Sequence, residues 1–320
     1  MSRLYNIYNK EELMQRLHAE PFQRKTISFY RYCKIFSPQD FRDSLFLAWD
    51  KWQVLGRIYV ANEGINAQMS IPEGNYEAFL QGLQEVPELC DMPIKVAVED
   101  DGKSFHKLVI KVRKKIVQDG IDDPNFDPSQ VGKHISAEEF NQYMEEPDTV
   151  VVDMRNSYES EVGHFENAVL PEAKTFREEL PEVLQLLQGQ EDKKILLYCT
   201  GGIRCEKASA YLKYHGYQDV NQLYGGIIHY AHEVNRKHIP SKFIGKNFVF
   251  DNRLGERISE EVISRCHTCG TPCDRHINCV NDSCHKLFLQ CEACSEKYDS
   301  CCQVECQEEL HFTKVKTQSL

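Results

Sequence analysis

The stretch Ile195-Leu196-Leu197-Tyr198-Cys199-Thr200-Gly201-Gly202-Ile203-Arg204-Cys205 decides the fold of the central part of the chain. It is typical of a short buried strand, a loop with two glycines and the first turn of a helix. Such a loop points backbone N–H groups at its own centre, and the helix that follows adds the positive end of its dipole. We therefore expect the pKa of the Cys199 thiol to be low, with Arg204 as its neighbouring positive charge and Thr200, Gly201, Gly202 and Ile203 as the supporting loop.

Strands and helices alternate on both sides of this stretch. A capping box, Ser136-Ala137-Glu138-Glu139, predicts the start of a short helix. Further strands are expected at 149–153, 194–198 and 221–223, and further helices at 181–187 and 205–215. Short apolar strands that alternate with helices indicate a parallel sheet with both faces covered, so residues 130–245 are predicted to form one α/β domain.

Several short motifs around the loop resemble the rhodanese superfamily. Asp153-Met154-Arg155 ends the first strand, Gly163-His164-Phe165 follows it, and Gly225-Gly226-Ile227 closes the sheet region. The six residues from Cys199 to Arg204 resemble the loop of sulfurtransferase rhodaneses, because the related dual-specificity phosphatases have one more residue there. The resemblance implies a reactive cysteine at position 199, with Asp153 and Arg155 in supporting positions.

Residues 1–118 are expected to form a separate N-terminal domain. Strands are indicated at 25–35, on both sides of the turn 62–66, at 94–98 and at 108–116, and helices after residue 37 and at 76–83. The order β-α-β-β-α-β predicts a ferredoxin-like (acylphosphatase-like) α+β domain. Lys111, Arg113 and Lys115 alternate on one face of the last strand; they are candidates for phosphate contacts with a nucleic acid, or they protect a sheet edge.

Ten of the fourteen cysteines lie after residue 265, in a C-terminal region defined as 246–320. Two CxxC pairs, Cys266/Cys269 and Cys291/Cys294, predict a tetrahedral zinc site. A second set of four is Cys279, Cys284, Cys302 and Cys306, with His267, His276 and His285 as alternative ligands. The region has few large apolar residues, so bound metal would supply part of its stability. Disulfides or a partly disordered tail are the competing interpretation.

Composition limits the function classes. A net charge of −11 argues against nucleic-acid binding over the whole surface, but the segment 107–115 is locally basic. No apolar stretch is long enough to span a bilayer, and the N-terminus lacks the layout of a signal peptide, so a cytoplasmic protein without membrane contact is expected. The sequence shows no flavin, nicotinamide or haem signature.

The chain as a whole resembles the bacterial rhodanese-domain tRNA uridine hydroxylases. The resemblance rests on motifs in all three parts, among them Ala61-Asn62-Glu63-Gly64-Ile65-Asn66, Lys111-Val112-Arg113, Phe176-Arg177-Glu178, Cys199 to Lys207 and Cys273-Asp274-Arg275-His276. It implies an oxidoreductase that hydroxylates the wobble uridine in the anticodon of tRNA to 5-hydroxyuridine. By this similarity dioxygen is the co-substrate and Cys199 the essential residue.

Two other functions fit the same loop. One is a sulfurtransferase that carries a persulfide on Cys199, and the other is a non-catalytic, zinc-bearing adaptor. Cys205 directly follows the loop and is either a resolving thiol or a residue that fills space in the first helical turn. The sequence leaves the oligomeric state open.

Overall fold

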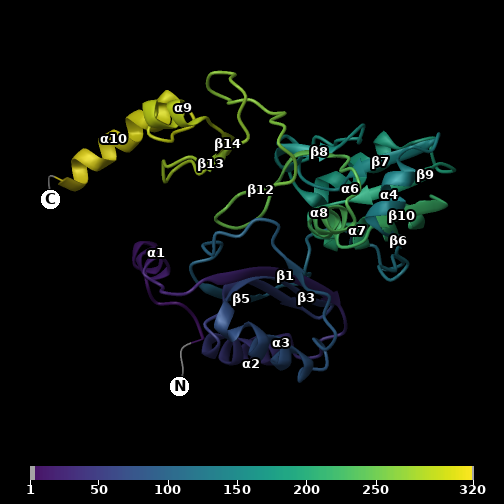
Figure 1. The fold of residues 1–320 in the computed structure, drawn as a ribbon, viewed down its shortest axis with the longest axis horizontal. Helices are drawn as coiled ribbons and strands as arrows, with labels where there is room; N and C mark the ends of the chain where they lie inside the picture. Colours follow the sequence, from purple (N-terminus) through teal and green to yellow (C-terminus); the bar gives the residue numbers. More distant parts are fainter. Residues whose placement is uncertain (1–3, 319–320) are drawn as a thin grey trace.

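The structure is a computed structural model that describes residues 4–318. It contains an N-terminal part, a central part and a C-terminal part, which follow one another along the chain (Figure 1). The N-terminal part comprises α1 (Lys10–His18), β1 (Arg24–Tyr32), α2 (Pro38–Lys51), β2 (Leu55–Ala61), β3 (Gly64–Pro72), η1 (Glu73–Asn75), α3 (Tyr76–Gln84), β4 (Lys95–Val96) and β5 (Leu108–Val112).

The N-terminal sheet has the strand order β4-β1-β3-β2-β5. Its first four strands pair antiparallel in the ferredoxin-like order, which confirms the predicted fold, and β5 adds a fifth strand parallel to β2. The helices α2 and α3 cover one face, where Trp49 and Phe79 pack on Phe29 and Ile58. The other face of the sheet is turned towards the central part of the molecule (Figure 1).

The central part is an α/β sandwich around a four-stranded sheet. It comprises β6 (Lys133–Ile135), α4 (Ala137–Tyr143), β7 (Thr149–Asp153), α5 (Ser157–Ser160), β8 (Gly163–Phe165), α6 (Phe176–Leu186), β9 (Lys194–Tyr198), α7 (Ile203–Tyr214), β10 (Asp219–Leu223) and α8 (Gly226–Lys237). The order is β6-β10-β9-β7 and every pair is parallel, as predicted. Ile195 and Leu197 of β9 pack with α6 and α7, whereas Leu196 and Tyr198 pack with α4 and α8. Both faces are therefore buried.

One helix of this part begins earlier than the sequence indicated. The predicted helix 181–187 is observed as α6, which begins at Phe176 and contains Pro181 in its interior. The side chain of Thr175 accepts a hydrogen bond from the Glu178 N–H and caps the helix at this earlier position. The capping box at Ser136 forms as expected.

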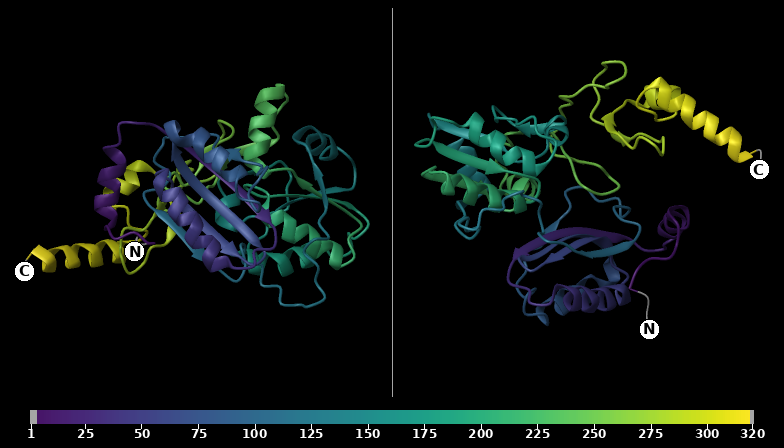
Figure 2. Two further views of the ribbon diagram at one scale, coloured as in Figure 1. Left: turned by 90° about the horizontal axis from the view of Figure 1, so that it is seen from below. Right: turned by 180° about the vertical axis from the view of Figure 1, so that it is seen from behind.

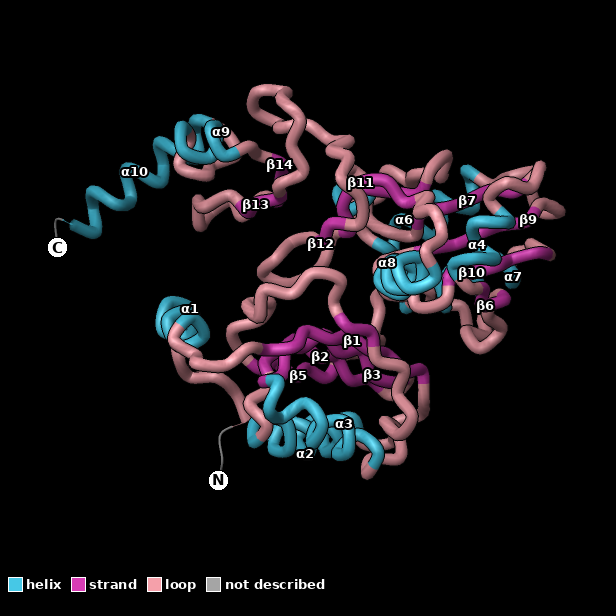
Figure 3. The backbone as a smooth tube through the Cα atoms, in the orientation of Figure 1, coloured by secondary structure: helices cyan, strands magenta, loops and turns pink. Residues whose placement is uncertain are grey.

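The C-terminal part consists largely of loops (Figure 3). Its elements are β11 (Phe243–Asn247), β12 (Glu256–Arg257), β13 (His276–Asn278), β14 (Leu287–Leu289), α9 (Glu292–Lys297) and α10 (Val304–Gln318). β11 pairs with β8 and with β12, and this pairing attaches the region to the central part. α10 projects away from the rest of the molecule (Figure 2). Within residues 4–318, no helix has the length and apolar character needed to cross a membrane.

Side chains of the N-terminal sheet hold it against the first turns of α7. The hydroxyl of Tyr30 donates to a carboxylate oxygen of Glu206 at 2.8 Å, and that of Tyr32 donates to the carbonyl of Ile203 at 3.3 Å. The ammonium of Lys207 lies 2.7 Å from a carboxylate oxygen of Glu63. These contacts place the open face of the N-terminal sheet opposite the loop that contains Cys199.

Candidate active site

Cys199 lies where the strand β9 ends and the helix α7 begins. The backbone N–H of Gly202 donates to its sulfur at 3.1 Å, and Gly202 has a φ of 98°, which glycine adopts without strain. Behind the loop, the N–H of Ile227 donates to the carbonyl of Cys199 at 3.0 Å. A β-carbon on Gly226 would lie 2.4 Å from that carbonyl oxygen, so the close approach of α8 requires glycine. The loop is therefore fixed from two sides.

The pKa of Cys199 is lowered to about 5. Burial of the side chain opposes this effect, because it disfavours the charged thiolate. A hydrogen bond from the Cys205 thiol, the charge of Arg204 and the backbone N–H groups of Arg204 and Cys205 outweigh the burial. Cys199 is therefore a thiolate at neutral pH. Burial, followed by the contact with Cys199, raises the pKa of Cys205, which thus stays protonated as the hydrogen-bond donor.

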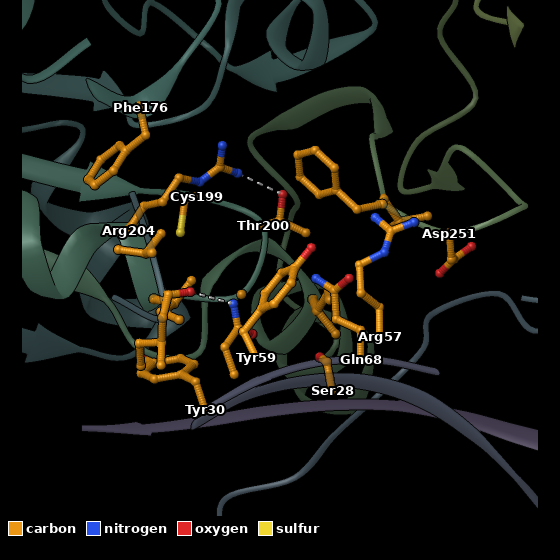
Figure 4. A pocket seen from close by; sticks show the side chains of 18 of the residues that line it. Ser28, Tyr30, Arg57, Tyr59, Gln68, Phe176, Cys199, Thr200, Arg204 and Asp251 are labelled. Carbon is orange, nitrogen blue, oxygen red and sulfur yellow. Dashed lines mark hydrogen bonds between the residues drawn. The ribbon is translucent and has the colours of Figure 1, made fainter. Parts of the chain in front are cut away.

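Arg204 is held by a carboxylate that the sequence did not single out. Its guanidinium donates two hydrogen bonds to the two carboxylate oxygens of Glu159, at 2.6 and 2.9 Å, and a longer one of 3.4 Å to the hydroxyl of Thr200 (Figure 4). Glu159 lies on α5 and is fully buried. The pair fixes the guanidinium beside the Cys199 loop and compensates its charge.

Asp153 and Arg155 form a second buried ion pair, behind the loop. The guanidinium of Arg155 contacts the carboxylate of Asp153 at 2.6 Å and donates to the carbonyl of Gly163. The hydroxyl of Tyr198, directly before Cys199, also donates to Asp153, at 2.7 Å. Neither Asp153 nor Arg155 lines the cavity, so both residues support the end of β9.

The Cys199 loop opens into a cavity of about 930 Å³ between the N-terminal sheet and the central part. Segments of all three parts line it, including residues 174–178 and 249–251. Among the described residues, its lining contains eight basic side chains, namely Arg57, Lys95, Arg113, Lys115, Lys174, Arg177, Arg204 and Arg253. The acidic side chains of the lining, counted over residues 4–318, are Glu178, Asp251 and Glu256. In a chain with a net charge of −11, this excess marks the cavity as a site for an anionic ligand.

The three predicted phosphate contacts take different positions. Arg113 and Lys115 line the cavity, whereas Lys111 lies beside Tyr59 in the sheet and outside the lining. The ammonium of Lys115 contacts Asp119 at 2.5 Å, so its charge is compensated. Arg113 lies 5.7 Å from the centre of the Tyr59 ring.

The polar turn around residues 62–66 attaches one domain to the other. Glu63 forms the ion pair with Lys207 of the central part, whereas the amide of Asn62 donates to the carbonyl of Ile35 within the N-terminal part. Of this segment, Asn66 lines the cavity, and the other lining residues lie farther along the two strands, including Arg57, Tyr59 and Gln68. The sequence signal for these residues was the alternation of polar and apolar positions along β2 and β3.

Lys95 is a further lining residue that the sequence analysis missed. It comes from β4, and its ammonium lies 4.6 Å from the centre of the Tyr30 ring. Burial lowers the pKa of Lys95 to about 8, while the nearby charges of Cys199 and Glu206 act in the opposite direction. The two-residue strand gives almost no periodicity from which to predict its orientation.

Eight of the ten C-terminal cysteines gather into the two sets of four expected from their spacing. The sulfur atoms of Cys266, Cys269, Cys291 and Cys294 lie within 4.8 Å of one another, and so do those of Cys279, Cys284, Cys302 and Cys306. Sulfur–sulfur distances of 3.7 Å (Cys269 to Cys291, Cys284 to Cys302) and 3.8 Å (Cys302 to Cys306) are recorded. A tetrahedral zinc ion with bonds of about 2.3 Å places its sulfurs about 3.8 Å apart. Both sets can therefore hold a metal ion.

The histidines considered as alternative ligands lie outside these two sets. His267 contacts the carboxylate of Glu161 at 2.7 Å, which links the first cysteine set to the end of α5. His276 is buried and packs on the ring of Phe248.

Comparisons with known proteins cover each part of the chain. Three family models match: the UPF0176 acylphosphatase like domain over residues 24–116, the rhodanese-like domain over 136–233 and the rhodanase C-terminal region over 244–307. The tRNA uridine(34) hydroxylase of Leptospira interrogans is 60% identical over 317 residues, which cover 99% of this chain and 86% of the relative. The protein of the same name from Pectobacterium atrosepticum is 52% identical over 311 residues, covering 97% and 88%.

Proposed function

Since this chain belongs to the tRNA uridine(34) hydroxylase family, we propose that it hydroxylates the wobble uridine of tRNA to 5-hydroxyuridine, with Cys199 as the reacting group. The observation that carries the proposal is the low-pKa thiolate of Cys199 at the wall of a basic cavity that all three parts of the chain line. A thiolate is the nucleophilic form of cysteine, and a basic cavity attracts the phosphates that flank a nucleoside.

In the proposed reaction the Cys199 thiolate adds to C6 of the uracil ring. The new sulfur–carbon bond moves the electron pair of the C5–C6 double bond towards C5 and O4, which makes C5 electron-rich. C5 then accepts one oxygen atom derived from dioxygen, which takes up a proton and becomes the hydroxyl group, and the other oxygen atom leaves as water with two protons and two electrons from an external donor. Loss of the C5 proton and departure of the thiolate from C6 give 5-hydroxyuridine and restore Cys199.

The surroundings of Cys199 suit this role. The N–H of Gly202, the thiol of Cys205 and the charge of Arg204 stabilise the thiolate before it reacts and again when it leaves. Because Glu159 holds Arg204 in two hydrogen bonds, the guanidinium keeps its place beside the loop through the cycle. Arg113, which directly follows β5, is proposed to contact phosphates of the anticodon loop, together with Lys111 in the strand and Lys115 beyond its end. The reaction would take place in the cytoplasm.

The two C-terminal cysteine sets are proposed to bind zinc. In each set the distances between the four sulfur atoms match those around a tetrahedral zinc ion. Four thiolate ligands fit a closed structural site, which has no open position for a substrate. Zinc would stabilise a region that has little regular structure and only small apolar clusters of its own.

Isotope labelling tests the proposed function against sulfur transfer. Replacing one oxygen of uridine by sulfur and adding one oxygen change its mass by nearly the same amount, so the source of the new atom must be traced. Purified protein is incubated with tRNA that lacks the modification, a reductant and heavy-isotope dioxygen, and the nucleosides are analysed by mass spectrometry. We expect the label at C5 of the wobble uridine, no product without oxygen and none with the Cys199→Ser variant.

The opposite result is equally clear. A product that forms without oxygen and contains sulfur from labelled thiosulfate would replace the hydroxylase by a sulfurtransferase. Neither label in the presence of folded protein, a reductant and each donor would reject both activities.

A further inference from the structure

Five polar side chains on the open face of the N-terminal sheet are not engaged in hydrogen bonds or ion pairs with other described residues, although Arg113 lies over the ring of Tyr59 and Lys95 over that of Tyr30. The strand register places Lys95, Ser28, Gln68 and Arg57 in one row across β4, β1, β3 and β2. Tyr59 lies one row further along β2, and all five line the cavity. Within residues 4–318 none of these five side chains makes a hydrogen bond or an ion pair.

Their neighbours on the same face are already engaged. Tyr30 donates to Glu206, and the amide of Asn66 donates to the carbonyl of Ile116 at 3.3 Å. Ser28, Gln68 and Tyr59 are half-buried, and among the described residues their side chains have no such hydrogen bond. None of the five has a fully buried polar atom without a partner, so their polar atoms are open to the cavity. They are therefore available to donate hydrogen bonds to a bound ligand or to accept them from it.

The types of these side chains indicate a nucleotide. Tyr59 offers an aromatic ring, and bases stack on such rings whatever their sequence. The amide of Gln68 both donates and accepts hydrogen bonds, as the edge of a base requires. Arg57 is exposed and has no ion pair among the described residues, and guanidinium groups bind phosphate in a fork of two hydrogen bonds.

The cavity has room for more than the target base. Its volume of about 930 Å³ is near the upper end of the range of about 300–1,000 Å³ for small-molecule sites. Figure 4 shows Ser28, Tyr59, Gln68 and Arg57 pointing from the sheet towards the side of the cavity that holds Thr200 and Cys199. A base at Cys199 therefore leaves the open face of the sheet accessible to the next nucleotide of the same strand.

We propose that this face binds the nucleotide adjacent to the wobble uridine. The base of this nucleotide stacks on Tyr59, its edge hydrogen-bonds to Gln68, and its phosphate faces Arg57. The inference rests on the proposed function, because it assumes an RNA strand whose target uridine lies at Cys199. In this arrangement the N-terminal sheet binds the RNA strand beside the target uridine and so positions the uridine at Cys199.

Fluorescence of 2-aminopurine tests the stacking directly. The Cys199→Ser protein, which cannot turn over, is titrated with an anticodon stem-loop RNA that carries 2-aminopurine immediately 5′ or immediately 3′ of the wobble uridine. We expect quenching in one of the two RNAs, retained by Tyr59→Phe and lost in Tyr59→Leu. The dissociation constant should rise about 5- to 150-fold in Tyr59→Leu, the range measured for loss of one stacked base.

Matched variants keep the test specific. Tyr5→Leu removes an exposed tyrosine outside the cavity and should behave like the parent protein. Gln68→Ala should weaken binding without removing the quenching, and it provides a second measurement if Tyr59→Leu unfolds. With Cys199 present, Tyr59→Leu should raise KM and leave kcat nearly unchanged, because stacking on the flanking base is the same in substrate and transition state.

The outcomes of these experiments distinguish a failure of the stacking site from a failure of the proposed hydroxylase function. Equal quenching and equal affinity in folded Tyr59→Leu, or an unchanged KM while 5-hydroxyuridine still forms, would overturn the stacking site and leave the hydroxylase in place. Absence of 5-hydroxyuridine with every protein, the parent included, would overturn the proposed function.

Discussion

Replacing Cys205 by alanine should raise the pKa of Cys199 and yet preserve most of its reactivity at pH 7. Cys205 is fully buried in the first turn of α7, and its thiol donates a hydrogen bond to the Cys199 sulfur. After the opposing effect of burial, this hydrogen bond is the largest influence on the pKa of Cys199. Alanine removes the donor, whereas serine replaces it by a hydroxyl that can donate in its place, so Cys205→Ser is the matched control.

The expected magnitude follows from the cost of one hydrogen bond. The pKa of Cys199 is lowered from its ordinary value of 9.0 to about 5. A hydrogen bond to a charged group contributes about 1.5–3 kcal/mol, and about 1.36 kcal/mol corresponds to one pKa unit. Loss of the Cys205 donor should therefore raise the pKa to about 6–7. At pH 7 between about half and nine-tenths of Cys199 would still be thiolate, so its reaction rate falls by no more than about twofold.

Alkylation by iodoacetamide measures this pKa at a single residue. Trypsin cleaves after Lys194 and after Arg204, so Cys199 is the only cysteine of the peptide 195–204. The rate of its alkylation, followed by mass spectrometry from about pH 4 to 9, gives the midpoint of the thiolate titration. A midpoint in Cys205→Ala equal to that of the parent protein would refute the assigned hydrogen bond. A loss of hydroxylation as complete as in Cys199→Ser would instead make Cys205 a resolving thiol.

The same shift has a consequence for stability. The pKa of Cys199 is lower in the folded protein than its ordinary value, so ionisation of Cys199 stabilises the fold fully above about pH 9. This contribution declines as the pH falls towards about 5. The Cys199→Ser variant lacks this pH dependence, and urea denaturation of both proteins across the range measures the difference.

Three further changes test other parts of the structure. Glu159→Gln should reduce the unfolding free energy of the central part by about 3–5 kcal/mol in urea denaturation, because it leaves the buried charge of Arg204 without its partner; an unchanged midpoint would show that the pair is not needed. Charge reversal at Lys111 and Arg113 should weaken binding of the anticodon stem-loop and flatten its salt dependence, whereas unchanged affinity in a salt titration would leave these residues as edge protection. Removal of metal by a chelator should raise hydrogen exchange after residue 251 while the central sheet stays protected, and metal-free protein with equal protection there would argue against zinc.

The sequence by itself determined the features that depend on neighbouring residues. The apolar run of β9, two glycines and a helix start were sufficient to predict the loop around Cys199, because strand, turn and cap each follow from local pattern. The ferredoxin-like order and the parallel sheet were predicted for the same reason. The spacing of eight cysteines predicted the two sets that the structure brings together. In the first set the two CxxC pairs are close in space by their connectivity, and in the second the members of each pair are separated by four residues (Cys279 and Cys284) or three (Cys302 and Cys306).

Only the tertiary structure decided how these parts form one site. Glu159 meets Arg204 from 45 positions away, and Lys95 of β4 reaches a cavity whose opposite wall carries Cys199. The alternation of Arg57 and Tyr59 with apolar residues shows in the sequence that one face of β2 is not buried in a core. Which part of the molecule lies opposite this face of β2 depends on a few polar contacts between domains, such as the hydrogen bond from Tyr30 to Glu206. Contacts of this kind between distant segments leave no periodic pattern in the sequence of either segment.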